Sequence, residues 1–455
     1  MTEEKNLLHE KLIEFNRSFN FDQRLFVAAV RVNFAYCDAL FHAGILTRLE
    51  AERVKNGLQT ILKRADYDKN YFLDAADDVH SFIEARLVGL IGEAGEKISV
   101  GRSRHDQSAT ALRLWLREEI EEISRVAGDL QAALIEAGER QKEAVAPACA
   151  HSRKIQPILW AHWCLAYFEM FARDRERLEE VWRRVNVLPL GAADAAGTAV
   201  EIAREDIARA LRFEGVSANS LDAASDTDYA IETIGACALM MTHLSRLAED
   251  LIRYNSDELG FLELINTPAE LLTTETISEA LELVRGRTAR VHGHQTALFS
   301  LTKNLSLGSH KDEQEIYAAI FDTVDTARSG LNIVSFILKN TRVNAGKTLA
   351  AATGEYYIQA ELIDYLTQRN VSVKSARISA GEIAAYAAAQ GKRTVELSLD
   401  EFHKFSEIIG DDIFYHLSIE QSLANKNQIG GTAPERVFEA LEQAKEILER
   451  NETDF

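Results

Sequence analysis

The chain has 455 residues, of which 46% are hydrophobic and 27% are charged. This balance is typical of globular proteins, and the length suffices for two or three domains or for one elongated helical body. The formal net charge of -20 opposes non-specific binding to nucleic acid or to an anionic membrane, so we expect neither partner.

Two further features restrict the cellular setting. The acidic, polar N-terminus lacks the pattern of a signal peptide, and no apolar run approaches the roughly 20 residues of a membrane span. We therefore expect a cytoplasmic protein. Widely spaced cysteines in apolar surroundings predict no disulfide and no metal site. They are Cys37, Cys149, Cys164 and Cys237.

The scarcity of proline indicates long helices. Only five prolines occur in the chain, and proline breaks helix interiors. Runs of β-branched residues with a period of two are absent, so the predicted fold class is all-α. The prolines are Pro147, Pro157, Pro189, Pro268 and Pro434.

The first half of the chain predicts helices of very different lengths. Apolar residues recur three and four positions apart along 5–98, which predicts several shorter helices. A long helix is predicted over about 106–144. Another is predicted from Gln156-Pro157 to about residue 185, because proline suits a first helical turn. A short helix follows at 204–211.

The strongest helical pattern covers about 228–257, with Asp226 or Thr227 as its cap. Apolar stripes on two faces are typical of a helix in the middle of a bundle. Two more long helices are predicted at about 278–303 and 312–339. Beyond them, short amphipathic segments separated by polar turns predict a small C-terminal region.

These patterns predict three helical domains. They are an N-terminal domain at 1–105, a central bundle of long helices at 106–345, and a small C-terminal domain at 346–455. A lone subunit would leave one apolar face of the long helices exposed to water, so we also expect self-association into a multi-helix core.

The short cationic stretch Gly101–Gln107 lies between two apolar helical patterns. Arg102 and Arg104 offer planar donor groups that suit carboxylates. Asp106 is predicted to cap the following helix, which would leave backbone N–H groups facing an anion. The stretch is therefore a candidate anion-binding site, and a capped loop with solvated arginines is the alternative.

This stretch belongs to an ordered series of motifs that resembles a known family. The series consists of Phe15–Phe19 with Asp22 (similar to F-N-x-S…D), Asp78–Glu84 (E-D-[IV]-H-x-x-I-E), Gly101–Gln107 (G-R-S-R-N-D-Q), His151 with Gln156-Pro157 (H-x-x-x-A-Q-P), Asn219–Asp226, Leu281–Arg287 and Gly430–Pro434. Over nearly its whole length the chain resembles argininosuccinate lyase, of the fumarase/aspartase superfamily.

The resemblance implies a homotetramer whose active sites are built from three different subunits. It implies an elimination that releases fumarate from an N-substituted aspartate, nominally argininosuccinate in arginine biosynthesis, without a metal or an organic cofactor. It also implies that His151 assists catalysis. The substrate-binding residues that it implies are Ser18, Arg102, Ser103, Arg104, His105, Gln107, Gln156, Lys311 and Gln314.

One catalytic segment departs from the family pattern. In the family a serine within G-S-S-x-M-P-x-K-x-N is the base, and a lysine and an asparagine of that loop stabilise the developing charge. The corresponding segment here, 265–280, contains no glycine, no lysine and no Ser-Ser pair. Glu270 and Glu275 add negative charge, which disfavours a dicarboxylate. The candidate substitute hydroxyls are Thr273, Thr274 and Ser278.

Single residues depart as well. His105 stands where the family has asparagine, and Ala150 stands where threonine precedes the histidine. Ser309 and Tyr317 replace the tyrosine and the last lysine of Y-N-K-D-x-Q-E-D-K, whereas Lys311 and Gln314 remain.

Three hypotheses therefore stand side by side. In the first, the chain is a lyase acting on argininosuccinate or a related N-substituted aspartate. In the second, it is a catalytically inactive paralogue that acts as a scaffold or regulatory subunit, including in a hetero-oligomer with an active paralogue. In the third, it is a lyase with a changed substrate and a different base. Without the loop serine we expect turnover of argininosuccinate to be absent or very weak.

Overall fold

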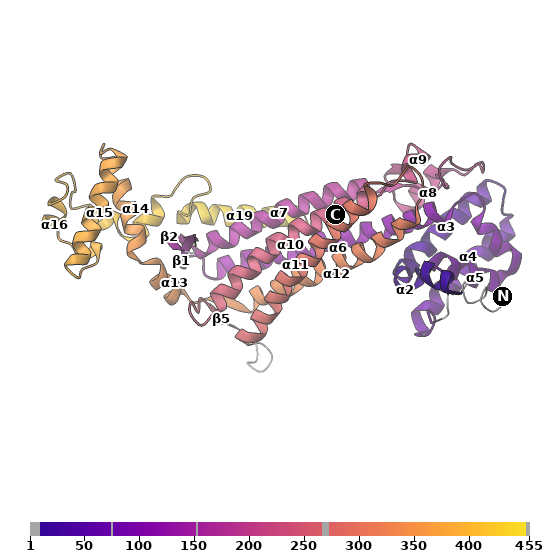
Figure 1. Ribbon diagram of the computed structural model, residues 1–455, viewed down its shortest axis with the longest axis horizontal. Helices are drawn as coiled ribbons and strands as arrows, with labels where there is room; N and C mark the ends of the chain where they lie inside the picture. The colour runs from indigo at the N-terminus through magenta and orange to yellow at the C-terminus, as the bar shows by residue number, and fades with distance from the viewer. Residues whose placement is uncertain (1–9, 74–75, 152, 266–272, 452–455) are drawn as a thin grey trace. The chain divides into compact units, whose positions relative to one another are not determined.

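A computed structural model describes residues 10–73, 76–151, 153–265 and 273–451 of the chain. Helices dominate and the strands are short, which confirms the predicted all-α fold (Figure 1). The chain forms two compact units. The first contains Met1–Arg125, Asp174–Met241 and Arg287–Ser329, and the second contains Val126–Arg173, Thr242–Gly286 and Gly330–Phe455. The predicted three-domain division stays a prediction.

Five long helices contribute to both units, because each is divided by the boundaries given above. No proline interrupts any of them, in agreement with the helix interiors expected from the sequence. The central helix, α10, begins and ends within two residues of its predicted bounds. These helices are α6 (Arg104–Arg140), α7 (Trp160–Val185), α10 (Asp228–Asn255), α11 (Thr274–Thr302) and α12 (Glu315–Lys339).

The first unit contains the N-terminal helices. The side chain of Thr47 accepts a hydrogen bond from the N–H of Glu50, whose carboxylate accepts from the N–H of Thr47, so a capping box starts α4. Besides the long helices, the elements of this unit are α2 (Phe19–Asp22), η1 (Gln23–Leu25), α3 (Phe26–His42), α4 (Arg48–Tyr67), α5 (Val79–Ile91), η2 (Gly92–Ser99), β3 (Val187–Leu188), α8 (Arg204–Leu211), β4 (Gly215–Val216), α9 (Ser220–Ala223) and η3 (Lys311–Gln314).

The stretch Glu10–His42 is long and apolar enough to cross a membrane by length and composition. Two thirds of its most apolar window is buried inside the protein. Its main helix, α3, packs against α4, α5 and α8. The side chain of Tyr36 in α3 is fully buried, as expected of a core helix.

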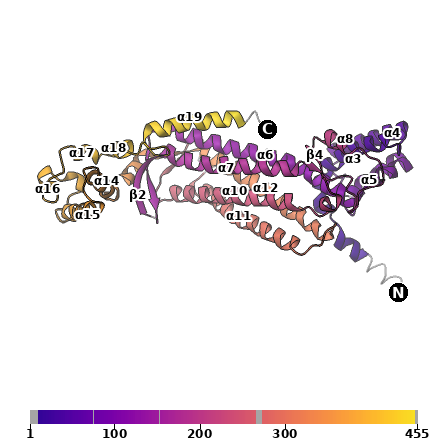
Figure 2. The same ribbon diagram turned by 90° about the horizontal axis from the view of Figure 1, so that it is seen from above.

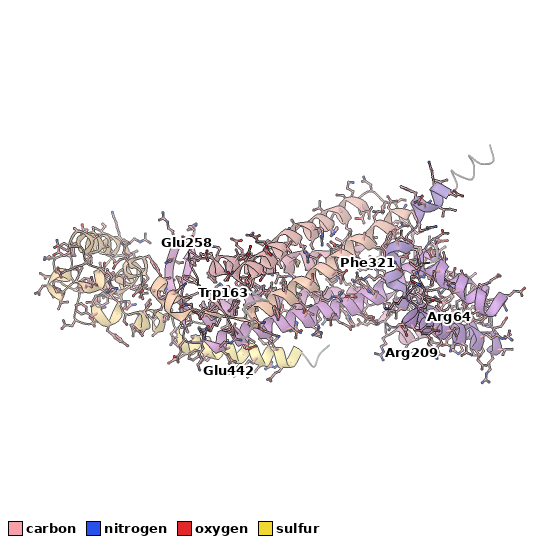
Figure 3. All side chains as sticks on the ribbon, turned by 90° about the horizontal axis from the view of Figure 1, so that it is seen from below. Arg64, Trp163, Arg209, Glu258, Phe321 and Glu442 are labelled. Carbon is pink, nitrogen blue, oxygen red and sulfur yellow. The ribbon has the colours of Figure 1, made fainter. Side chains whose placement is uncertain are left out.

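Stacked side chains fix η1 against the long helices of the first unit. The guanidinium of Arg24 lies 4.9 Å from the ring centroid of Trp115 in α6 and 5.2 Å from that of Phe321 in α12. Phe321 is labelled in Figure 3. It also makes a bidentate ion pair with Asp325, with both N–O distances at 2.6 Å. This contact holds η1 against α6 and α12, and the preceding residues Ser18 and Asp22 line a cavity together with the first turn of α6.

The second unit has its own apolar cores. Its elements besides the long helices are β1 (Val145–Ala150), β2 (Arg153–Leu159), β5 (Leu262–Leu264), β6 (Thr341–Val343), α13 (Ala345–Ala352), α14 (Glu355–Gln368), α15 (Val373–Ala389), η4 (Thr394–Glu396), α16 (Leu399–His403), α17 (Ile413–His416), α18 (Ile419–Ala424) and α19 (Pro434–Asn451). One core lies among α13 to α18. In the other, Val437 and Leu441 of α19 pack with Leu165 and Phe168 of α7. Figure 2 shows α19 running alongside α6 and α7. Trp163 of α7, labelled in Figure 3, stacks on Trp160 with ring centroids 4.5 Å apart.

Two predicted helix starts are wrong. Asp106 is not the cap of α6: Ser103 is, because its Oγ accepts the N–H of Asp106 at 3.1 Å while the Asp106 carboxylate accepts the N–H of Ser103 at 3.0 Å. Pro157 does not begin a helix, because it lies in β2 opposite Pro147 of β1. Proline lacks an N–H group, so a paired position that requires no donor tolerates it.

Candidate active-site pocket

A cavity of about 290 Å³ lies in the first unit, where motif segments far apart in the sequence meet. Its walls come from α2, the starts of α6, α10 and α12, and the segment that contains η3. The polar lining residues are Ser18, Asp22, Asp78, Arg104, His105, Ser108, Asp194, Asp226, Thr227, Tyr229, Ser309, His310, Lys311, Glu313, Gln314 and Tyr317. Five of the predicted substrate-binding residues therefore line one cavity: Ser18, Arg104, His105, Lys311 and Gln314.

Ser18 and Asp22 form one wall of the pocket. The Ser18 hydroxyl donates to Asp22 Oδ2 at 2.6 Å, and the Val79 N–H donates to Asp22 Oδ1 at 3.0 Å. Burial raises the pKa of Asp22 to about 6 in spite of these hydrogen bonds. The Ser18 hydroxyl is thus held by its own helix, and a ligand would meet it as an acceptor.

The start of α6 is fixed by Asp106, which is almost completely buried. Besides the N–H of Ser103, its carboxylate accepts the N–H groups of Gly191 and Ala193 at 3.0 and 2.9 Å. Burial nevertheless raises the pKa of Asp106 above its usual range. One side chain therefore joins the helix start to the connector before α8.

Arg104 lines the cavity, but its guanidinium is engaged within the protein. It donates to both oxygens of Glu84 at 3.2 and 2.8 Å and to Gln107 Oε1 at 2.9 Å. It also lies 3.4 Å from Asp78. A ligand carboxylate would have to compete with these groups for it.

Arg102, Ser103 and Gln107 do not line the cavity. The Arg102 guanidinium is buried 5.0 Å from the ring centroid of Tyr36 and donates to Asn33 at 2.8 Å. Burial lowers the pKa of Arg102 to about 10. Arg102 Nε and Nη1 and Gln107 Nε2 have no hydrogen-bond partner among the described residues. These three predicted binding residues are therefore outside the cavity lining.

His105 and Glu313 lie next to each other in the lining of the cavity. His105 Nδ1 lies 3.3 Å from Glu313 Oε2, and both side chains are about 15% exposed. Burial raises the pKa of Glu313 to about 7 and lowers the pKa of His105. Near neutral pH the pair therefore combines a half-protonated carboxyl with an uncharged imidazole.

Lys311 is the cation of the pocket that makes no ion pair with another described residue. Its side chain is exposed, and it also lines a neighbouring cavity of about 360 Å³ with Asn16, Asp77 and Asp78. Gln314 Oε1 lacks a partner among the described residues. Five carboxyl groups line the main cavity against two permanent cations, Arg104 and Lys311. The pocket of one subunit can thus hold a carboxylate at Lys311 but favours a ligand that is also cationic.

The remaining predicted residues belong to the second unit. His151 is exposed in the turn between β1 and β2, with a left-handed φ of 52°. Gln156 is half-buried in β2 and opposes Ala148. The described structure therefore does not bring these two residues into the cavity of the first unit.

The proposed substitute hydroxyls are used at the start of α11. Thr273 Oγ1 accepts the N–H of Thr276 at 3.1 Å, so Thr273 caps the helix. Asn255 donates to the backbone carbonyl of Thr274 at 2.7 Å and to the Ser278 hydroxyl at 3.1 Å. Glu270 lies outside the described residues.

Sequence reasoning missed Glu313 and the acidic character of the pocket. Glu313 lies in a run with Asp312 and Glu315, and nothing in the sequence shows which of the three carboxylates points inward. The structure selects it because the N–H of His310 donates to Glu313 Oε1 at 3.4 Å, which turns the side chain toward His105.

Comparisons with known proteins identify the family of the chain. A family model described as lyase matches residues 9–270, and one described as argininosuccinate lyase C-terminal matches residues 358–424. The argininosuccinate lyase of Geobacter sulfurreducens is 41% identical over 435 residues, 95% of each chain. That of Moorella thermoacetica is 38% identical over 443 residues, 96% of each chain. The crystal structure of EDDS lyase in complex with formate superposes with a TM-score of 0.84 at 21% identity, covering 95% of this chain and 88% of that chain, which supports the fold.

Proposed function

The chain belongs to the argininosuccinate lyase family of the fumarase/aspartase superfamily, and from this premise we propose an argininosuccinate lyase-like protein that binds an N-substituted aspartate but turns over argininosuccinate itself weakly or not at all. One observation carries the proposal. The cavity retains family residues such as Ser18, Lys311 and Gln314, whereas the segment that should supply the base lacks its serine and its lysine.

The chemistry explains why this combination separates binding from turnover. A proton on carbon next to a carboxylate is weakly acidic, so its removal requires a positioned base and cationic or N–H donors for the charge that develops. Thr273 and Ser278 are engaged at the start of α11, and Glu275 adds negative charge there. Binding requires only the carboxylate and cation contacts that Lys311 and the pocket acids offer.

We extend the proposal to the assembly. A cytoplasmic homotetramer would bring His151 and Gln156 of one subunit to the cavity of another, and the central domain, 106–345, would form its core. Large apolar side chains that remain exposed on α11 and α12, Leu283, Phe299 and Phe336, support such an association. The small C-terminal domain, 346–455, would stay outside this core.

The second candidate is an inactive paralogue that assembles with an active lyase. The altered segment 265–280 favours it, because a partner subunit with an intact loop could complete a cavity of this chain. Co-expression with an active argininosuccinate lyase should then yield mixed oligomers whose activity per oligomer exceeds that expected from their active subunits alone.

Two measurements test the main proposal. Thermal unfolding with argininosuccinate, succinate or fumarate should show stabilisation by at least one of these ligands. Absorbance of fumarate at high enzyme concentration should show little or no release from argininosuccinate. Rapid fumarate release would contradict the loss of turnover, and the absence of stabilisation by every dicarboxylate would contradict binding.

A further inference from the structure

His105 and Glu313 are a paired imidazole and carboxyl at positions where the family pattern has asparagine and an unspecified residue. We propose that Glu313, oriented by His105, accepts a proton from the ligand bound in this cavity and so takes the role that the loop serine has in the family. This inference rests on the proposed function, because it requires a bound ligand with a carbon–hydrogen bond next to a carboxylate.

The geometry holds the carboxyl from two sides. The N–H of His310 approaches Glu313 Oε1 at 3.4 Å, while His105 Nδ1 approaches Oε2 at 3.3 Å. Glu313 precedes α12 and His105 lies in the first turn of α6, so separate elements position the two groups. Glu313 nevertheless borders the cavity, which is the access that a general base requires.

The surroundings tune the carboxyl for proton transfer near neutral pH. Asp312, Asp226, His310, Tyr229 and Tyr317 are the other titratable groups that face Glu313. Burial and the two aspartates raise the pKa of Glu313 to about 7, and His310 opposes this effect only in part. A carboxyl of this pKa is a stronger base than an ordinary glutamate and is still ionised in a useful fraction.

Asp194 and His310 are the charged or titratable groups that face His105 besides Glu313. Burial lowers the pKa of His105, so the imidazole is uncharged near neutral pH. An uncharged ring 3.3 Å from Oε2 restricts the position of the carboxylate without placing a full positive charge beside it. His105 is therefore a positioning residue in this proposal.

The same wall indicates the ligand class. Lys311 lies two positions before Glu313 and is the cation available for a ligand carboxylate, while Asp22 and Asp194 line the cavity and favour a cationic nitrogen. An amino dicarboxylate with a basic N-substituent satisfies both. In the proposed step, Glu313 takes the proton from the carbon next to a carboxylate, and the electron pair of that C–H bond is delocalised into the carboxylate. Return of a proton to the carbon restores the ligand, so no co-reactant is required.

Hydrogen–deuterium exchange tests this step without requiring complete elimination. The wild-type protein is incubated with argininosuccinate in D₂O, and loss of the methylene signals of the succinyl group is followed by proton NMR. We expect exchange that rises with pH through about 7, because the base must be ionised. Glu313→Gln should slow exchange at least about 100-fold, whereas Glu315→Gln, on an exposed neighbour, should exchange like the wild type. His105→Asn should lower exchange less and shift its pH midpoint.

Thermal unfolding of each variant with argininosuccinate separates the possible failures. Stabilisation of the wild type without exchange would overturn this inference and leave the proposed function intact. Wild-type exchange in a folded Glu313→Gln variant would also overturn it. No stabilisation by any dicarboxylate would overturn the proposed function itself. If Glu313→Gln does not fold, Glu313→Asp, which retracts the carboxyl by one methylene, should slow exchange while keeping its pH dependence.

Discussion

The start of α6 and the turn between β1 and β2 both match family motifs, but the protein holds them in different ways. At the start of α6, Asp106 is buried and accepts three backbone N–H groups. In the hairpin turn, His151 is exposed in a left-handed conformation, and no described hydrogen bond involves its side chain. A motif residue that is satisfied within its own subunit stabilises that subunit. One that is left exposed is available to another subunit or to a ligand.

Asp106→Ala is the substitution that should separate the two regions most. Removing the carboxylate leaves the N–H groups of Ser103, Gly191 and Ala193 without their acceptor in a largely buried place. We expect the free energy of unfolding to fall by about 3 kcal/mol or more. Urea-induced unfolding followed by circular dichroism measures this loss.

Asp66→Ala provides the control for this substitution, because Asp66 is an exposed aspartate in α4. It should change the free energy of unfolding by less than about 0.5 kcal/mol. If Asp106→Ala were as mild as Asp66→Ala, the start of α6 would not be the stabilised region that this comparison assumes.

Glu313 is an intermediate case, because its burial is compensated less completely than that of Asp106. Its folded-state pKa of about 7 exceeds the ordinary value of 4.5, so the folded protein holds this proton more tightly than the unfolded chain does. The stabilising contribution of this proton is complete below about pH 4.5 and is lost as pH rises through about 7. Glu313→Gln removes the titration, so relative to wild type the variant should gain on the order of 1 kcal/mol between pH 5 and pH 8, after allowance for partial exposure.

Free energies of unfolding of wild type and Glu313→Gln at pH 5 and pH 8 measure this gain. Glu315→Gln, which alters an exposed carboxylate two positions away, is the matched variant. A gain at pH 5 rather than at pH 8 would reverse the sign and would show that the carboxyl of Glu313 is stabilised in its ionised form.

Ser103→Ala should have an effect of about 1 kcal/mol, since it removes the hydroxyl that caps α6. Ser103→Thr retains a capping hydroxyl and should recover most of the loss. Thermal unfolding of the two variants provides the measurement. Equal stabilities of Ser103→Ala and wild type would mean that Asp106 alone fixes the helix start.

Local patterns predicted the helices well, and contacts between distant segments explain what they missed. Helix α8 lies at its predicted residues, 204–211, because apolar spacing at three and four residues is a local property. The pattern at Gln156-Pro157 predicts a helix start, but Pro157 pairs with Pro147, ten residues earlier, in a hairpin. This pairing is not visible in the local pattern. In α6, Ser103 and Asp106 are both acceptable caps by residue type, and only their mutual hydrogen bonds decide between them.

The candidate site was predictable as a set of segments rather than as a set of side-chain directions. The motifs placed Ser18, His105 and Lys311 together, and the cavity contains all three. The direction of Arg102 depends on Tyr36 and Asn33 of α3, which are more than 60 residues earlier in the chain. No spacing rule within Gly101–Gln107 distinguishes an arginine that faces the cavity from one that is buried behind it.

His151 should have the smallest effect on stability and thereby gives the clearest test of its region. His151→Ala removes an exposed side chain, so we expect the free energy of unfolding to change by less than about 0.5 kcal/mol. His151→Val should cost about 1 kcal/mol, because a β-branched residue is strained at positive φ, whereas His151→Gly should be tolerated. If the hairpin serves a neighbouring subunit, His151→Ala should also reduce the stabilisation by argininosuccinate while leaving the unliganded protein unchanged. A large loss of stability without ligand would mean that His151 supports its own subunit, and the two motif regions would then not differ in kind.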